Sequence, residues 1–199
     1  MRELTEALKD KFSRHFSKYG DLTAEEKAAI HESMQVKEFD RGRILVSPGD
    51  TLRETYFILE GLVRSYYLTG NDEVTTAFFA EEEWVLSPGD GVTALPSPTG
   101  LVCMEQTLVV TGNEKSARLL FEKFPRFESV AMAIVQDAFF TQQARHTEWI
   151  TQSAEQRYLA LQKQRPDIFQ RVSQYHIASY IGVKPESLSR IRKRIAGQK

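Results

Sequence analysis

The segment from Gln174 to Ile195 carries the residues of this chain that are best suited to contact another macromolecule. In its second half, which begins at Pro185, Glu186 lies four residues before Arg190. Residues at that spacing project together from one face of a helix. An arginine can donate two hydrogen bonds to guanine O6 and N7, and a glutamate can accept one from cytosine N4. The pair therefore has the chemistry to read the bases of DNA.

Other polar residues of the same stretch surround this pair. Together the predicted DNA contacts are Lys184, Glu186, Ser187, Ser189, Arg190, Arg192, Lys193 and Arg194. The cations from Arg192 to Arg194 are better placed to contact phosphates, which position a protein on DNA without specifying a sequence. The alternative interpretation is an ordinary surface pair of Glu186 and Arg190 on an inert helical hairpin.

The residues that would position this face predict a helix-turn-helix. Ala178 is small where two crossing helices would meet, and Gly182 can adopt the positive φ of a tight turn. Lys184, which precedes a proline, is biased away from the helical region, and Pro185 suits the first position of the second helix. Ser173 is a suitable N-cap for the first helix. The small shared core would consist of Ile177, Val183, Leu188 and Ile191. This order of positions is typical of the motif.

The charge is unevenly distributed along the chain, although the net charge is only −1. From Ser153 to the end there are ten Lys and Arg residues against three Asp and Glu residues, a net charge of +7, and the preceding residues carry −8. A basic module beside an acidic body indicates a polyanionic partner for one end of the molecule. On charge alone, a basic end that only aids solubility explains the asymmetry equally well.

The stretch from Val36 to about Thr111 has a sequence pattern typical of β-structure. Short β-rich runs alternate there with turn signals such as SPGD, TGND and PSPTG. Several short strands at about ten-residue spacing are typical of an all-β barrel or sandwich. LVSPGD at 45–50 and VLSPGD at 85–90 nearly repeat, and Pro followed by Gly suits a type II turn. The sequence therefore predicts an α+β chain with an antiparallel β-roll of the jelly-roll type.

Helices are predicted on both sides of this β-roll. Two amphipathic helices fall within 2–34, the second with a capping box formed by Thr23 and Glu26. After the β-roll the chain reads as helical, with a long helix over about 125–150 and a shorter one capped by Ser153.

The long helix has apolar residues on two sides, which predicts that both sides are covered. One stripe consists of Phe127, Val130, Ala131, Ile134 and Ala138, and the other of Met132, Val135, Phe139, His146, Trp149 and Ile150. One stripe would pack on the β-roll and the other on the same helix of a second copy, giving a twofold dimer. We assign the dimer contact to Phe127, Ala131, Ile134 and Ala138. The alternative is that neighbouring helices of the same chain cover both stripes.

Composition argues against several classes of protein. The longest charge-free run, 91–104, contains two prolines and falls short of the ~20 residues of a membrane span. The N-terminus has charges where a signal peptide needs an apolar core, so a cytoplasmic protein is expected. A lone cysteine, Cys103, excludes an internal disulfide and a multi-cysteine metal cluster, and we expect it to be buried. All four histidines lie outside the β-region, which argues against a metal-bearing enzyme. We expect no catalytic activity, no cofactor and no metal.

Nearly all of the chain resembles the Crp/Fnr family of bacterial transcription regulators. The strongest match is VKPESLSRIRKRI at 183–195, where a Glu followed four residues later by an Arg corresponds to Glu186 and Arg190. Gly49 and Gly61 match turn glycines of the family's β-roll. The resemblance implies a β-roll sensory domain over 1–124, a dimerisation helix over 125–152 and a helix-turn-helix domain over 153–199. It also implies a palindromic operator in double-stranded DNA, a homodimer, and RNA polymerase as a further partner.

Two features depart from the family's pattern. We expect no β-wing after the second helix, so any hairpin beside the helix-turn-helix would have to lie within 164–172. The region 78–102 lacks the Gly-Glu pair and the arginine with which relatives hold a cyclic nucleotide. No Lys or Arg occurs from 65 to 114, where eight acids do: Asp72, Glu73, Glu81, Glu82, Glu83, Asp90, Glu105 and Glu114. Because a buried phosphodiester needs a cation or aimed backbone donors, we expect no response to cyclic AMP or cyclic GMP.

These observations favour a homodimeric, sequence-specific transcriptional regulator. The rival from another class is a ligand-binding or protein-binding β-roll whose helical tail no longer reads DNA. Neither the effector, nor its pocket, nor the sense of regulation follows from the sequence. Trp84, Phe78 and Phe79 could line an apolar effector pocket, but we expect them to belong to the core. His146, on an apolar stripe, is likewise expected to be a core residue rather than a ligand.

Overall fold

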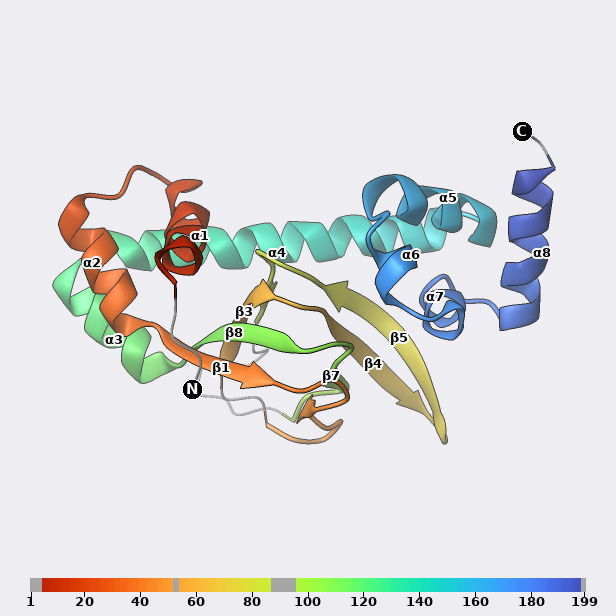
Figure 1. The fold of residues 1–199 in the computed structure, drawn as a ribbon, viewed down its shortest axis with the longest axis horizontal. Coiled ribbons are helices and arrows are strands. Elements are labelled where there is room, and N and C mark those ends of the chain that lie inside the picture. The colour runs from red at the N-terminus through yellow and green to blue at the C-terminus, as the bar shows by residue number, and fades with distance from the viewer. Residues whose placement is uncertain (1–4, 52–53, 87–95, 198–199) are drawn as a thin grey trace.

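The structure is a computed structural model, and it describes residues 5–51, 54–86 and 96–197. Its helices are α1 (Glu6–Ser17), α2 (Ala24–Ser33), α3 (Glu114–Lys123), α4 (Arg126–Thr151), α5 (Ala154–Gln164), α6 (Ile168–Arg171), α7 (Gln174–Tyr180) and α8 (Pro185–Ala196). Its strands are β1 (Gln35–Phe39), β2 (Ile44–Val46), β3 (Thr55–Glu60), β4 (Val63–Thr69), β5 (Asp72–Phe79), β6 (Trp84–Val85), β7 (Thr99–Cys103) and β8 (Thr107–Gly112). Figure 1 shows the β-body in the middle, α4 running past it, and the remaining C-terminal helices at one end.

The β-body is the predicted antiparallel roll. In the described part of the chain, its strands form two four-stranded sheets, with the orders β1-β8-β3-β6 and β2-β7-β4-β5. All the strand pairs are antiparallel. The strands β7 and β8 are separated only by residues 104–106, with a short bend at 104–105. The second SPGD turn, at 87–90, lies outside the described residues.

The two predicted N-terminal helices pack on one end of this roll. Thr23 Oγ1 accepts from the Glu26 N–H, and the Glu26 carboxylate accepts from the Thr23 N–H, which confirms the capping box. Phe12 of α1 packs between Phe57 of β3 and Trp84, with ring centroids 5.0 and 5.9 Å away. Phe78 is buried and Trp84 lies in this aromatic cluster, so both belong to the core as expected. The helices thus close one side of the roll.

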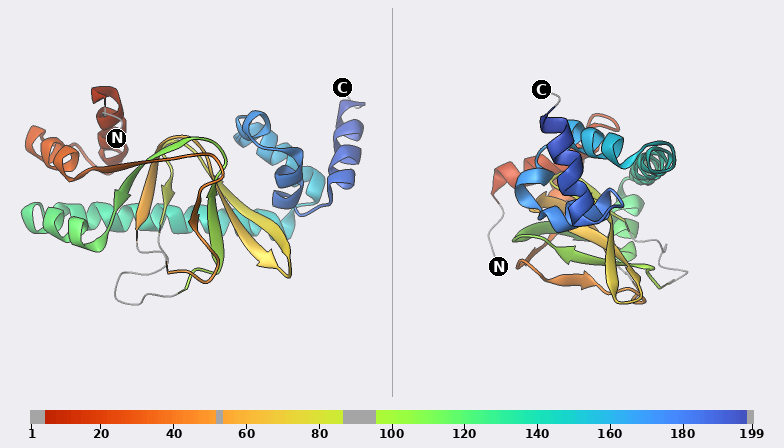
Figure 2. Two further views of the ribbon diagram at one scale, coloured as in Figure 1. Left: turned by 60° about the horizontal axis from the view of Figure 1, so that its bottom comes forward. Right: turned by 90° about the vertical axis from the view of Figure 1, so that its right-hand side faces the viewer.

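The long helix α4 lies along one side of the β-body, as Figure 2 shows from two further directions. Pro125 occupies the cap position before α4 rather than its first turn. Phe127, Val130 and Ile134 are buried with residues of α1 and β3 in a single apolar cluster. Phe127 is 1% exposed and Ile134 is 7% exposed. This corrects the assignment of the dimer contact, because these two residues are already covered by their own chain.

The second stripe of α4 is the uncovered one. Met132, Val135 and Phe139 are each at least half exposed, and Phe139 is 57% exposed. Ala131 and Ala138, the other two members of the assigned contact, are partly buried. His146 is exposed on the outer stripe and is therefore not the core histidine that was expected. The apolar period of α4 predicted that both of its stripes are covered, and within one chain only the stripe of Phe127, Val130 and Ile134 is buried.

Candidate nucleic-acid interface

The helix-turn-helix is formed by α7 and α8. The N-cap Ser173 accepts from the His176 N–H, and Gly182 has a φ of +74° at the turn. Lys184 is extended, and Pro185 begins α8. A compact core holds the two helices together: Ile177, Ala178, Ile181, Leu188 and Ile191 are all buried. The predicted motif is present with the geometry that its sequence indicates.

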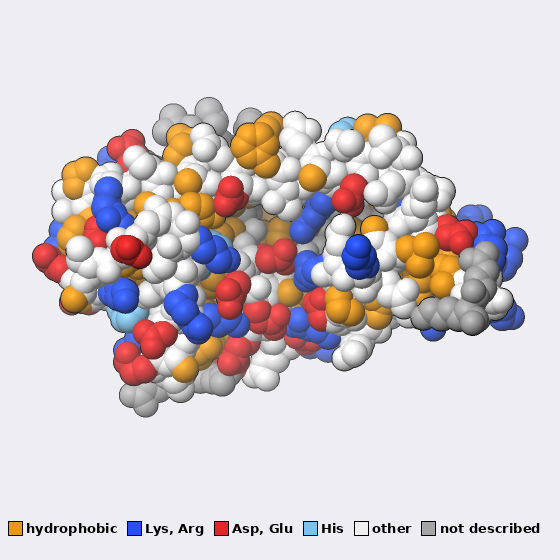
Figure 3. All heavy atoms as spheres, turned by 90° about the horizontal axis from the view of Figure 1, so that it is seen from above, with side chains coloured by type: hydrophobic (Ala, Val, Ile, Leu, Met, Phe, Trp, Pro, Cys, Tyr) orange, Lys and Arg blue, Asp and Glu red, His pale blue; other side chains and the backbone are white. Residues whose placement is uncertain are grey.

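The outer face of α8 carries a row of exposed polar side chains. Glu186, Ser189, Arg190 and Lys193 follow the spacing i, i+3, i+4 and i+7, so they share one side of the helix. The Arg190 Nε lies 3.5 Å from the backbone oxygen of Glu186, and its guanidinium reaches no carboxylate in the described residues. Figure 3 shows Lys and Arg side chains gathered at the end of the molecule that α8 forms. The outer face therefore presents free donors and an acceptor to its surroundings.

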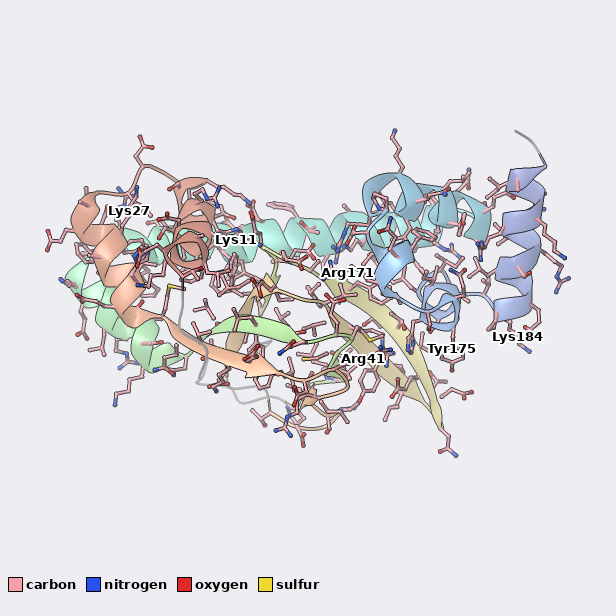
Figure 4. All side chains as sticks on the ribbon, viewed as in Figure 1. Lys11, Lys27, Arg41, Arg171, Tyr175 and Lys184 are labelled. Carbon is pink, nitrogen blue, oxygen red and sulfur yellow. The ribbon has the colours of Figure 1, made fainter. Side chains whose placement is uncertain are left out.

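Other predicted contacts lie at the flanks of this face. Arg192 donates to Gln174 Oε1 over 3.0 Å, and Arg194 pairs with Glu155 of α5. Both arginines are exposed. Ser187 is half-buried, and Lys184 is exposed where α8 begins (Figure 4). The structure thus gathers all eight predicted residues on α8 and its N-cap, with Glu186 in the first turn of the helix and Arg190 one turn later.

The turn between α7 and α8 packs against the end of α4. The Trp149 ring lies so close to Gly182 that a Cβ there would meet it at 2.4 Å. Arg157 stacks on that ring, with 4.3 Å from its Cζ to the ring centroid. The same guanidinium donates to the Ile181 oxygen over 2.9 and 3.1 Å and to the Trp149 oxygen over 3.1 Å. Nothing in the sequence pattern alone indicated that Gly182 must also make room for an indole.

The acids of the β-body meet cations from the C-terminal helices. Arg171 contacts both Glu81 and Glu105, and Glu83 lies 3.3 Å from Arg165 and 3.6 Å from Arg145. In Figure 3 the acidic and basic side chains lie side by side between the β-body and these helices, and Figure 4 places Arg171 there. The two opposite charges that the sequence separates are therefore in part paired with each other.

Arg64 is also engaged within the fold. It is 4% exposed, pairs with Glu73, and donates to Thr75 Oγ1 over 3.3 Å. Its guanidinium stacks on Tyr66 at 4.9 Å. Burial, and then the charge of Arg64, lowers the pKa of His176. Two of the three guanidinium nitrogens of Arg64 are thus engaged within the fold, and its buried Nε has no hydrogen-bond partner among the described residues.

A cavity of about 560 Å³ lies between β5, α4 and the C-terminal helices. Its wall includes Arg145, Arg157 and Arg165, which come from outside the cation-free interval 65–114. The absence of cations from 65–114 therefore does not make the wall free of cations, because α4, α5 and the residue after α5 each contribute an arginine to it. Residues 87–95, which make up much of the region compared with nucleotide-binding relatives, lie outside the described residues.

The remaining candidate chemistry is structural. Cys103 is buried, and burial raises the pKa of its thiol. His15 accepts from Trp84 Nε1 over 2.9 Å, and its pKa falls to about 4 because of burial and the nearby Lys18.

Among the described residues, no group of three His, Cys, Asp or Glu side chains could hold a metal ion. No helix in the described ranges is long and apolar enough to cross a membrane. Residues 164–172, where a hairpin could have lain, hold the helix α6.

Comparison with known proteins supports the fold. Neither a scan of protein-family models nor a search of curated protein sequences finds a match. Solved structures do match, among them the c-di-GMP-responsive global regulator CLP of Xanthomonas campestris, with a TM-score of 0.69 and 16% identity over 88% of this chain and 93% of that chain. FixK2 from Bradyrhizobium japonicum gives 0.67 and 15%, over 83% and 85%. A CooA variant from Carboxydothermus hydrogenoformans gives 0.65 and 13%, over 84% and 78%. The predicted Crp/Fnr-type fold is therefore confirmed.

Proposed function

We propose that this chain is a homodimeric, sequence-specific DNA-binding transcriptional regulator of the Crp/Fnr type, without catalytic activity. The observation that carries the proposal is the outer face of α8. Glu186, Arg190 and Lys193 project there together, on a helix whose opposite side is buried in the motif's own core. An arginine with no carboxylate partner on such a face can donate to guanine, and the neighbouring cations can hold phosphates.

The fold supports a regulatory role for this face. Similar structures include proteins described as a global regulator and as a catabolite activator protein. The units we propose are a β-roll over 1–124, the long helix over 125–152 and a reader over 153–199. RNA polymerase, as a further partner, is an expectation drawn from the resemblance alone.

The partner we propose for the outer stripe of α4 is a second copy of the chain. Met132, Val135, Phe139, Gln142, His146 and Trp149 follow alternating spacings of three and four, and all six side chains are exposed. That spacing is the a and d pattern of a two-stranded coiled coil. A twofold dimer would place two copies of α8 at one end of the paired helices, as a palindromic operator requires.

We also propose that cyclic AMP and cyclic GMP are not effectors. A phosphodiester in the cavity would need one of the three arginines of its wall. Arg145 and Arg165 already face Glu83, and Arg157 is held by backbone oxygens of Ile181 and Trp149. A nucleotide phosphate would therefore have to displace a carboxylate from a position that the fold supports.

The rival function is a binding β-roll whose helical end no longer reads DNA. A reader that had lost its function would not need to keep Glu186, Arg190 and Lys193 together on an uncovered face. The exposed face is the observation that favours DNA over this rival.

Selection from a pool of random duplexes tests the proposed function. We expect the purified protein to enrich one palindromic sequence, with half-sites about 34 Å apart or at a multiple of that distance. Enrichment that disappears when Arg190 is replaced by alanine would tie the selection to α8. Recovery of the pool without sequence preference, at low as well as moderate salt, would overturn the proposal in favour of the rival.

A further inference from the structure

The turn Glu81–Glu82–Glu83 between β5 and β6 is built to hold two carboxylates in fixed positions. Glu82 has a φ of +66°, which is rare for a residue other than glycine. The Glu81 carboxylate accepts from the Gly61 N–H over 2.9 Å, and the Glu83 carboxylate accepts from the Ala80 N–H over 2.7 Å. The turn is also tied to β3, because the Glu82 N–H donates to the Ile58 oxygen over 2.8 Å. These backbone N–H groups orient the Glu81 and Glu83 carboxylates independently of the arginines.

Three arginines from different elements converge on these two carboxylates. Arg171, at the end of α6, contacts both oxygens of Glu81 over 2.9 and 3.0 Å, in a two-pronged pair. Arg165, which follows α5, and Arg145 of α4 both face Glu83. The Arg171 side chain is only 19% exposed. Two parallel hydrogen bonds between a guanidinium and a carboxylate fix orientation as well as distance.

The titration behaviour agrees with this geometry. Burial would raise the pKa of Glu81, but hydrogen bonds from Arg171 and from backbone N–H groups outweigh burial and lower it. Burial would likewise lower the pKa of Arg171, but its hydrogen bonds to Glu105 and Glu81 raise it. Both partners therefore stay charged near neutral pH.

The reader itself is seated on the same side of the β-body. β5 is an edge strand, and its Thr75 N–H donates to Ser179 Oγ of α7 over 2.8 Å. The rings of Phe78 and Tyr180 lie 5.2 Å apart. Residues of the β-body and of the C-terminal helices share one apolar cluster: Leu62, Phe78, Ala80, Tyr158, Leu161, Ile168, Val172, Ile177, Ala178, Ile181, Leu188 and Ile191. The ion pairs thus border a buried contact that includes α7.

We propose that Glu81 and Glu83, with Arg171 and Arg165, form an ionic latch that fixes the angle of the reader on the β-body and so sets the half-site spacing that the dimer accepts. This inference rests on the proposed function. The apolar cluster holds the C-terminal helices against the β-body, and the two-pronged pair of Arg171 and Glu81 fixes their orientation. With the latch neutralised, the angle of the reader on the β-body is less closely fixed, and the distance between the two copies of α8 varies. The four residues are positioning residues and do not touch DNA.

The test compares two variants of the full-length protein. The double variant Glu81→Gln/Glu83→Gln is made in a protein that also carries Glu105→Gln, because Arg171 otherwise keeps its pair with Glu105. It removes both carboxylate charges of the turn and keeps side-chain oxygens that can accept from the Gly61 and Ala80 N–H groups. The control described next carries Glu105→Gln as well. Glu82→Gln is the matched control, since Glu82 lies in the same turn, is exposed, and forms no ion pair with a described arginine. Circular dichroism establishes that both variants are folded before the comparison.

The first measurement is hydrogen exchange of the free protein. We expect peptides covering β5 and α7 to exchange about tenfold faster in the double variant, while β3 and the control variant behave as the original protein does. The second measurement is binding to duplexes with one or two base pairs inserted between the half-sites. The original protein and Glu82→Gln should accept one spacing, and the double variant should bind several spacings within about threefold of each other.

The outcomes separate the latch from the proposed function. Exchange and spacing preference that match the control would overturn the latch. Faster exchange with an unchanged single spacing would overturn its role in setting the spacing. If the original protein itself selects no duplex, the proposed function fails, and the exchange of β5 and α7 still decides whether the ion pairs hold the reader in place.

Discussion

Two charged regions of this molecule, the turn Glu81–Glu83 and the outer face of α8, differ in what their charges meet. In the turn, Glu81 and Glu83 meet arginines of the same chain and are also supported by backbone N–H groups. On α8, Glu186, Arg190 and Lys193 lie in a row without any such partner among the described residues. Charge that is paired within the chain serves the fold, and charge that a folded helix presents unpaired is available to another molecule.

The same distinction applies to the two stripes of α4. Phe127 and Ile134 are buried by their own chain, whereas Met132, Val135 and Phe139 are uncovered. A contiguous exposed apolar stripe on a helix marks a contact with another molecule. The comparison therefore separates residues whose loss damages the fold from residues whose loss damages an association.

The largest effect is expected for a charge on the outer stripe of α4. Phe139→Glu should give a monomer that binds the selected operator about 10²–10⁴-fold more weakly, because the two half-sites are no longer held together. Light scattering and titration of the operator measure the two parts of this prediction.

The matched variant lies on the inner stripe of the same helix. Phe127→Ala should instead lower the free energy of unfolding by about 3–5 kcal/mol, since it empties a buried site. Phe127→Glu and Ile134→Glu would bury a charge, and are expected to impair folding rather than to yield folded monomers. A Phe139→Glu protein that remains dimeric would show that another surface joins the copies.

A smaller effect is expected on α8. Arg190→Ala should cost roughly 1–3 kcal/mol of binding free energy on the operator and flatten the preference at one base pair. The melting temperature should barely change, because an exposed side chain without a charged partner contributes little to stability. Titrations on the operator and on random DNA measure the first part, and thermal melts measure the second.

Lys193→Ala separates base reading from charge on the same helix face. It should weaken binding to all sequences alike and reduce the slope of log affinity against log salt by about one. Equal losses on operator and random DNA for Arg190→Ala would place Arg190 with Lys193 as a phosphate contact.

The smallest expected effect is none. A ligand present at 100 times its dissociation constant stabilises the folded state by about 2.7 kcal/mol, which a thermal melt detects. We expect no shift with millimolar cyclic AMP or cyclic GMP, and a clear shift with the selected operator as the positive control. Calorimetry that gave a micromolar dissociation constant for either nucleotide would mean that an arginine of the cavity wall leaves Glu83 to bind it.

Features that depend on neighbouring residues could be predicted from the sequence. The capping box of Thr23 and Glu26, the N-cap at Ser173 and the positive φ of Gly182 each follow from residue types a few positions apart. The helix-turn-helix is built from such local signals, so both its helices and the face of Arg190 were predicted. Alternating β-rich runs and turns likewise sufficed for the roll.

Features that depend on which surfaces meet could not be predicted. The helical period shows that α4 has two apolar stripes, but it contains no information on which stripe faces the β-body, and so Phe127 and Ile134 were misassigned. From the sequence, the acids at 81–83 were expected to repel a nucleotide phosphate. Their partners, Arg165 and Arg171, lie more than eighty positions away in the sequence. Distant pairs of this kind are visible only when the chain is folded.

The contact between Gly182 and the Trp149 ring joins the helix-turn-helix directly to the long helix α4. The ring lies at the end of the exposed stripe of α4 and also beneath the turn that joins α7 to α8, where even a methyl group would collide with it. A residue with a side chain at position 182 would therefore have to displace the Trp149 ring, and with it the contact between the end of α4 and this turn. The absence of a side chain at Gly182 is thus what allows the end of α4 and the turn between α7 and α8 to pack this closely.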